Sequence, residues 1–106
     1  MPEPDLALDR LIHEPGRLAI LTVLSSAGDA DFLFLQRATG LTKGNLSSHL
    51  AKLEDAGLVA IEKEFIAKIP NTRVSVTKNG RAAVERHWKR LDQLRQASLE
   101  WTPEPS

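Results

Sequence analysis

The stretch TGLTKGNLSSHLAKLEDAGLV, residues 39–59, joins two kinds of helical sequence in a single expected helix. Its second half, residues 50–56, is built mainly from Leu, Ala, Lys and Glu, which are strong helix formers. Its first half, residues 43–48, has Gly, Asn or Ser at four of six positions, and these residues favour caps and turns over helix interiors. The beginning of this helix therefore has small polar side chains and a lower helix propensity than its second half.

A helical wheel separates an apolar face from a small polar face. Leu46, Leu50 and Leu53 fall on one side, as expected for a face that packs on a core. Gly44 and Ser48 fall on the other side, near the helix beginning, where unpaired N–H groups and the helix dipole attract phosphate. Such a surface suits close approach to DNA, with charge for the DNA backbone supplied by Lys43 and Lys52. Capping alone also explains these residue types, so the helix by itself leaves the function open.

Working back from this helix, the sequence predicts three more helices. Thr42 is a candidate N-cap, and a short helix with Asp31 as its cap ends at Gly40. The turn-forming residues 25–31 separate that helix from an earlier one, which has Pro15 in its first turn and apolar residues all round. A first helix covers residues 5–13, with Asp5 as its cap.

After Gly57 the pattern changes from helix to strand. Alternating apolar residues in 58–65 and 72–77 predict two strands with one buried face, and Pro70 with Asn71 predicts the turn between them. Thr77 then caps a long final helix. The fold class is therefore mainly α with a small β-hairpin: a winged helix-turn-helix, with a three-helical core, an N-terminal helix and a long C-terminal helix.

The predicted organisation is one domain. It covers residues 5–100 and is flanked by short tails at 1–4 and 101–106. Within it we expect a recognition helix at 42–56, a wing at 58–77 and a C-terminal helix at 78–100.

Composition narrows the functional class. The 106 residues include no cysteine, which argues against disulfides and zinc-thiolate sites. No apolar run is long enough for a membrane span, and the acidic beginning does not look like a signal peptide, so we expect a cytoplasmic protein. The net charge is zero, but residues 41–81 carry seven basic and four acidic side chains. This local excess of positive charge favours a polyanionic partner.

The runs GNLSSHLAKLEDAGLV and VTKNGR carry a family resemblance. The chain resembles, over about residues 7–90, the small winged helix DNA-binding proteins related to MarR-like and ArsR-like bacterial transcriptional regulators. The resemblance implies a homodimer, joined through the terminal helices, that binds an inverted repeat in double-stranded DNA, and a repressor is the expected kind of regulator. Carried over by position, the DNA-facing residues are Thr42, Lys43, Gly44, Asn45, Ser47, Ser48 and His49 in the helix, and Lys68, Asn71, Thr72 and Arg73 in the wing loop.

Two positions depart from the family pattern. Relatives often have Arg where this chain has Ser48, so a bidentate guanine contact is missing there. The wing is also less basic than in relatives, because Phe65, Ile66 and Ile69 make it partly apolar. These apolar residues either pack under the wing or meet a partner, which puts deep insertion of the wing in question.

The final helix carries an apolar stripe longer than one small domain can cover. We therefore expect a second chain to share it. The predicted dimer interface comprises Leu8, Leu11, Ile12, Val84, Trp88, Leu91 and Leu94.

Other functional classes find less support. The three histidines do not form a metal-binding pattern, and no catalytic motif is present, so we expect no metal, no cofactor and no enzymatic activity. Two alternatives stay open: a winged helix used as a protein-interaction module, and a regulator with an effector pocket at the dimer interface near Trp88.

Overall fold

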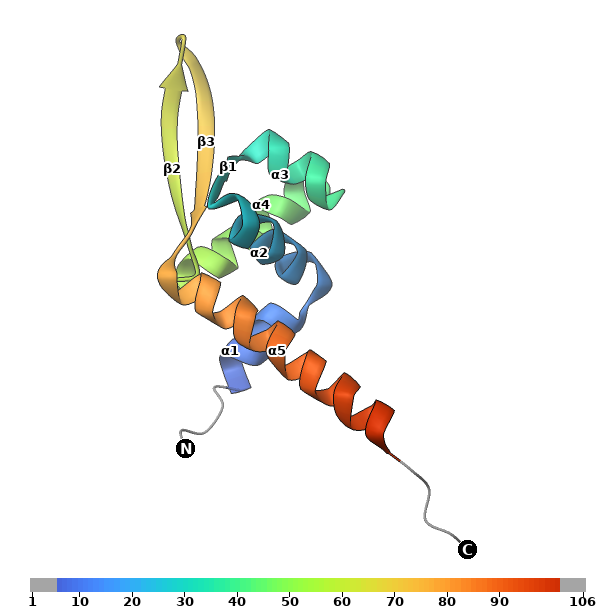
Figure 1. The fold of residues 1–106 in the computed structure, drawn as a ribbon. Coiled ribbons are helices and arrows are strands. Elements are labelled where there is room, and N and C mark those ends of the chain that lie inside the picture. The colour runs from blue at the N-terminus through green and yellow to red at the C-terminus, as the bar shows by residue number, and fades with distance from the viewer. Residues whose placement is uncertain (1–5, 102–106) are drawn as a thin grey trace, which may run out of the picture.

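The computed structural model describes the backbone of residues 6–101 and the side chains from Asp9 to Trp101 (Figure 1). Asp5, the predicted cap of the first helix, lies outside this range. In chain order the elements are α1 (Leu6–His13), α2 (Pro15–Ala27), β1 (Asp29–Asp31), α3 (Phe32–Thr39), α4 (Lys43–Asp55), β2 (Val59–Ile66), β3 (Ile69–Val76) and α5 (Lys78–Glu100). The predicted fold class, a mainly helical winged helix, is confirmed.

Helix α2 lies at the centre of the domain and contacts all four other helices. Its apolar residues face several directions, and Ile20, Leu21 and Leu24 are fully buried. A helix can have apolar side chains all round only when neighbours cover it on several sides. None of the helices in the described range combines the length and hydropathy needed to cross a bilayer.

The sheet has one strand more than the sequence predicted. Its order is β1-β3-β2 and all pairs are antiparallel. Strand β1 falls in the stretch predicted to be a turn, and it pairs Ala30 with Val74 at the edge of the hairpin. The Val76 N–H donates to the Gly28 carbonyl at 3.0 Å, which extends this pairing. Asp-Ala-Asp has little intrinsic strand propensity, so this strand depends on its long-range partner.

The hairpin turn is not where the sequence predicted it, and the prediction at Pro70 and Asn71 was wrong. The two turn residues are Ala67 and Lys68, with φ values of 51° and 68°, and Pro70 pairs with Phe65 inside the ladder. Two consecutive left-handed residues match the type I′ turn, whose twist suits adjoining antiparallel strands. Pro70 is tolerated near the hairpin end, where a missing N–H costs little.

Thr77 joins α5 to the corner between α4 and β2. Its side-chain oxygen accepts from the Gly80 N–H at 3.0 Å and donates to the Gly57 carbonyl at 2.7 Å. Its own N–H donates to the Leu58 carbonyl at 3.0 Å. These three hydrogen bonds fix the direction of α5, whose C-terminal half projects beyond the rest of the domain in Figure 1.

Part of the predicted dimer interface belongs to the core. Ile12 and Val84 are 0% and 1% exposed, so their own chain already covers them and their assignment to the interface was wrong. Leu11 is half-buried against the same core. The side chain of Leu8 lies outside the described side chains.

The rest of the α5 stripe is exposed. Trp88, Leu91 and Leu94 are 46%, 38% and 60% exposed, and Leu99 and Trp101 farther along are 69% and 70% exposed. The Trp88 indole N–H donates to the Thr22 hydroxyl at 3.3 Å, which holds one edge of the ring against α2. An apolar row therefore continues along α5 after α1 and α2 cease to cover it.

Candidate nucleic-acid interface

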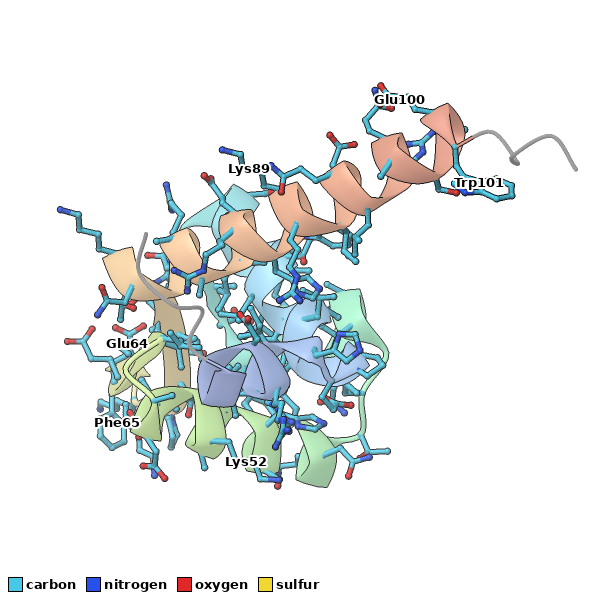
Figure 2. All side chains as sticks on the ribbon, turned by 90° about the horizontal axis from the view of Figure 1, so that it is seen from below. Lys52, Glu64, Phe65, Lys89, Glu100 and Trp101 are labelled. Carbon is cyan, nitrogen blue, oxygen red and sulfur yellow. The ribbon has the colours of Figure 1, made fainter. Side chains whose placement is uncertain are left out.

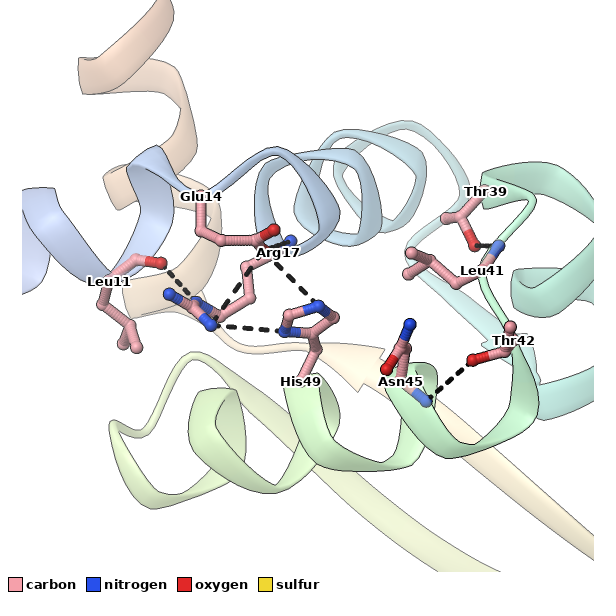
Figure 3. Close-up of polar contacts among 8 residues, drawn as sticks. All are labelled: Leu11, Glu14, Arg17, Thr39, Leu41, Thr42, Asn45 and His49. Carbon is pink, nitrogen blue, oxygen red and sulfur yellow. Dashed lines mark hydrogen bonds and ion pairs between the residues drawn. The ribbon is translucent and has the colours of Figure 1, made fainter.

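Helix α4, the predicted recognition helix, begins at a well-formed cap (Figure 3). The Thr42 hydroxyl accepts from the Asn45 N–H at 3.1 Å, and the Thr42 carbonyl accepts the first helical bond from Leu46. Gly40, with φ of 72°, ends α3 and allows the sharp turn into α4. The cap satisfies the Asn45 N–H, while the other N–H groups of the first turn are available to an external acceptor.

The two faces of α4 differ as the helical wheel predicted. Leu46, Leu50 and Leu53 are between 0% and 2% exposed and pack in the core. The opposite face has no large apolar side chain. At the beginning of the helix its surface is polar and formed by short side chains. The exposed residues on and beside this face are Lys43, Gly44, Asn45, Ser47, Ser48 and Lys52.

Gly44 is not required by the fold. No atom lies within 4 Å of the place where a Cβ would project, and its φ is not in the left-handed region. Alanine at this position would fit and would favour the helix. What the glycine provides is the absence of a side chain on an outward surface, which lets another molecule approach the backbone of α4 closely.

His49 faces α2 from the side of α4. Its ring is half-buried, with Nε2 at 3.5 Å from Glu14 Oε2 and Nδ1 at 3.2 Å from the Arg17 guanidinium (Figure 3). Because Arg17 can only donate, Nδ1 accepts, and the ring proton lies on Nε2 facing Glu14. The ring also packs over Gly16, where a Cβ would come within 2.8 Å of Nε2. His49 therefore anchors α4 to the beginning of α2, and its predicted contact with DNA stays a prediction.

Glu14 caps α2 and contacts the side chains of Arg17 and His49. Its Oε2 accepts from the Arg17 N–H at 2.8 Å. Burial by itself raises the pKa of the Glu14 carboxyl, but hydrogen bonds from the Arg17 and Gly16 N–H groups, with electrostatic attraction to the neighbouring His49 and Arg17 side chains, outweigh it. The pKa of Glu14 consequently lies below its usual value, and the folded state favours the carboxylate.

Glu14→Gln should lower the free energy of unfolding at pH 7 by about 0.5–1 kcal/mol, because a charge is lost at a helix N-terminus. Because the pKa of Glu14 is lowered in the folded state, its carboxylate stabilises the fold at pH values above the unfolded pKa of about 4.5. This stabilisation is lost as the pH falls through the folded pKa. Urea unfolding at pH 7 and pH 4 should show the difference between wild type and variant shrinking at the lower pH. Glu54→Gln, on the exposed end of α4, is the control, and a difference independent of pH would contradict the prediction.

Of the predicted wing-loop residues, only Lys68 lies in the loop. Asn71, Thr72 and Arg73 lie within β3, so their placement in the loop was wrong. The Asn71 amide donates to Glu64 Oε1 on the neighbouring strand at 3.0 Å. The turn is two residues long instead of the longer loop expected, which moves these three side chains away from the tip.

Arg73 is held by the edge strand. Its guanidinium donates twice to the Asp29 carboxylate, from Nη2 at 2.8 Å and from Nε at 3.2 Å. Hydrogen bonding and charge from Asp29 raise the pKa of Arg73 above its usual value. This bidentate pair ties β1 to β3, so Arg73 orients the wing from its base.

Three charged residues contribute to this surface and were not singled out from the sequence. Glu14 and Arg17 hold α4 through His49, and nothing local in the sequence indicates this pairing across 32 or more positions. Lys63 lies on the same face of β2 as Val59 and Ile61, and the strand alternation could have identified it.

Comparisons with known proteins agree with this geometry. Residues 17–95 match the family model of the winged helix DNA-binding domain. An uncharacterized protein of Methanocaldococcus jannaschii is 35% identical over 85 residues, which cover 80% of this chain and 92% of the relative.

Two solved structures show the same fold. A transcriptional regulator homologue from Pyrococcus horikoshii is 34% identical with a TM-score of 0.79, over 87% of this chain and 90% of its own. A MarR-family transcriptional regulator from Silicibacter pomeroyi is 24% identical with a TM-score of 0.64, over 91% of this chain and 67% of its own. With the capped helix α4, the paired hairpin of β2 and β3 and the matched family model, this chain belongs to the winged helix DNA-binding domain family.

Proposed function

We propose that this protein is a sequence-specific transcriptional regulator that binds double-stranded DNA as a homodimer and acts as a repressor. The outward face of α4 carries the proposal. This face combines the exposed N-terminus of α4 with the small residues Gly44, Ser47 and Ser48. Lys43 and Lys52 lie at its borders. Backbone N–H groups and small hydroxyls can contact phosphates and base edges, while the lysines add charge.

The proposed contacts divide by type. Asn45, Ser47 and Ser48 read base edges in the major groove, and Thr42, Lys43 and Lys52 contact the DNA backbone. Lys68 reaches the flanking groove from the tip of the hairpin. Without an arginine at position 48, discrimination rests on amide, hydroxyl and backbone groups.

Dimerisation is proposed from the exposed row on α5. Trp88, Leu91, Leu94 and Leu99 form an apolar edge on a helix that extends past its own domain. A second copy related by a two-fold axis would cover this row with the same row. The two recognition helices would then enter adjacent major grooves of an inverted repeat.

Repression follows from occupancy. A dimer bound across a promoter excludes other proteins from the same DNA without any further contact. Such a regulator works where the chromosome lies, which is the cytoplasm in a bacterial cell.

The test is selection of the purified chain on a pool of random duplexes at about 0.15 M salt, followed by titration at several salt concentrations. We expect an inverted repeat with half-sites about 10–11 bp apart. We also expect the logarithm of affinity to fall linearly with the logarithm of salt concentration. Sequence-blind binding with no enriched repeat would overturn the proposal and favour a protein-interaction module.

Leu94→Arg should separate the proposed dimer, because a charge would have to be buried in an apolar contact. Leu94 is 60% exposed, so the domain itself should stay folded. Sedimentation equilibrium should show the mass falling from twice 11.7 kDa to 11.7 kDa. Gln93→Arg, which adds the same side chain on the polar side of α5, is the control. A Leu94→Arg variant that stays dimeric would place the interface elsewhere.

A second candidate function, control by a small ligand, is favoured by a cavity between α1 and α5. Its volume is about 300 Å³, and it is lined by Asp9, Arg10 and His13 of α1 and by His87, Arg90, Leu91 and Leu94 of α5. Within the lining, Arg90 Nη1 lies 3.2 Å from Asp9 Oδ2. The His13 and His87 rings meet edge to face with centroids 5.8 Å apart. Because Asp9 is paired with Arg90, Arg10 adds positive charge to the apolar walls of Leu91 and Leu94, and this combination suits a small aromatic carboxylate. Repeating the DNA titration with benzoate present would show whether such a ligand changes the affinity.

A further inference from the structure

The tip of the hairpin is narrow and apolar. Phe65, Ile66 and Ile69 are 75%, 56% and 67% exposed, and they surround the two-residue turn at Ala67 and Lys68. Large apolar side chains at the exposed end of a two-stranded ribbon do not support the core of this domain. They therefore need another explanation.

The two faces of the hairpin differ in charge. Side chains alternate along a strand, so Lys63 and Phe65 share a face with Ile61, which packs on the core, and Glu62 and Glu64 lie on the other face. In Figure 2, Phe65 lies on the side of the molecule where α4 exposes Lys52, and Glu64 lies on the other side of the hairpin. The face that continues from the recognition helix is therefore apolar and basic.

Glu64 and Arg73, which lie on the acidic face, are engaged within the sheet. Glu64 accepts from Asn71, and Arg73 bonds Asp29. Among the ion pairs of the described residues, none includes Lys63 or Lys68. Lys63, on the same face as Phe65, and Lys68, in the turn, thus form no ion pair among the described residues.

We infer that the wing inserts Phe65 as an apolar wedge into the minor groove of the bound duplex and bends it. The inference rests on the proposed function. Proteins that bind the minor groove insert Phe, Ile or Pro between base steps and kink the duplex toward the major groove. Phe65 and its cross-strand neighbour Pro70 provide such side chains, and Lys63 and Lys68 contact the phosphates on either side.

The dimensions favour DNA over a protein partner for this tip. A standard protein interface buries about 800 Å² on each partner, which the end of one two-stranded ribbon cannot offer. The minor groove is only about 6 Å wide and accepts a narrow projection. The wedge also explains the exposed Phe65 in a DNA-binding domain, because unstacked bases present apolar faces to an aromatic ring.

The experiment compares Phe65→Ala with Ile66→Ala, an apolar truncation on the opposite face of the same tip. Both positions are exposed, so both variants should fold. The probe is a 30-bp duplex from the selection described above, with 2-aminopurine at each flanking step in turn and a donor and acceptor dye at its ends. Wild type should raise 2-aminopurine fluorescence at one flanking step of each half-site and shorten the end-to-end distance.

Phe65→Ala should lose both signals and about tenfold or more in affinity, whereas Ile66→Ala should keep both signals and stay within twofold of wild type. Phe65→Ala within twofold of wild type, or equal losses in the two variants, would overturn the inference and leave the proposed function intact. If the wild-type protein showed no salt-dependent binding to any duplex, both the inference and the proposed function would be overturned.

Discussion

Gly80→Ala is expected to lower the free energy of unfolding by about 2–3 kcal/mol, although alanine is the better helix former by about 1 kcal/mol. A Cβ on Gly80 would overlap the carbonyl oxygen of Leu58 and lie 3.0 Å from Val76 Cγ2. The obstacle is backbone, and the same carbonyl accepts the Thr77 N–H. The first turn of α5 would have to move away from the corner between α4 and β2.

Thermal unfolding measures this effect directly. A loss of this size should lower Tm by about 10 °C or more in a domain of about 100 residues. Gly44→Ala is the matched control, because a Cβ there meets no atom within 4 Å and should raise stability slightly. Equal effects of the two substitutions would show that α5 does not dock on Leu58 as described.

Gly44→Glu should reduce DNA affinity by roughly 100-fold or more while the domain stays folded. The carboxylate would project from the first turn of α4, where a negative charge favours the helix. The same charge would face phosphates or base acceptors, and juxtaposed like charges cost several kcal/mol of binding free energy. Each loss of about 1.4 kcal/mol lowers the affinity tenfold. Fluorescence anisotropy with a selected duplex measures the loss, and far-UV circular dichroism checks the fold.

Two further variants at this position separate charge from size. Gly44→Gln adds the same bulk without the charge and should lose less affinity than Gly44→Glu, with a smaller difference at high salt. Gly44→Ala should have the smallest effect. Retention of full affinity by Gly44→Glu would remove the beginning of α4 from the interface, whatever else binds DNA.

The parts of the fold that depend on local periodicity could be predicted from the sequence. The three leucines of α4 repeat at helical spacing, and Leu46, Leu50 and Leu53 are buried as the wheel required. The caps at Thr42 and Thr77 also form as their residue types predicted. In each case the interaction spans no more than a few turns of one helix.

The features that were missed depend on distant partners. Strand β1 exists because Ala30 pairs with Val74, and no local signal in Asp-Ala-Asp indicates a strand. The hairpin turn occupies Ala67 and Lys68 because the strand register overrides the turn preference of Pro70. The neighbourhood of His49 likewise combines helices far apart in sequence. The sequence alone could not identify Glu14 and Arg17 as the partners of His49.

The position of α5 against α2 has a consequence for the order in which the protein becomes folded during synthesis. Ala83 and Val84 are each 1% exposed and close the core, yet they belong to the last of the described elements to leave the ribosome. Until α5 has emerged, one flank of the strongly apolar α2 has no cover. The nascent chain is therefore exposed to aggregation late in translation, and a chaperone that binds apolar helices would find its target there.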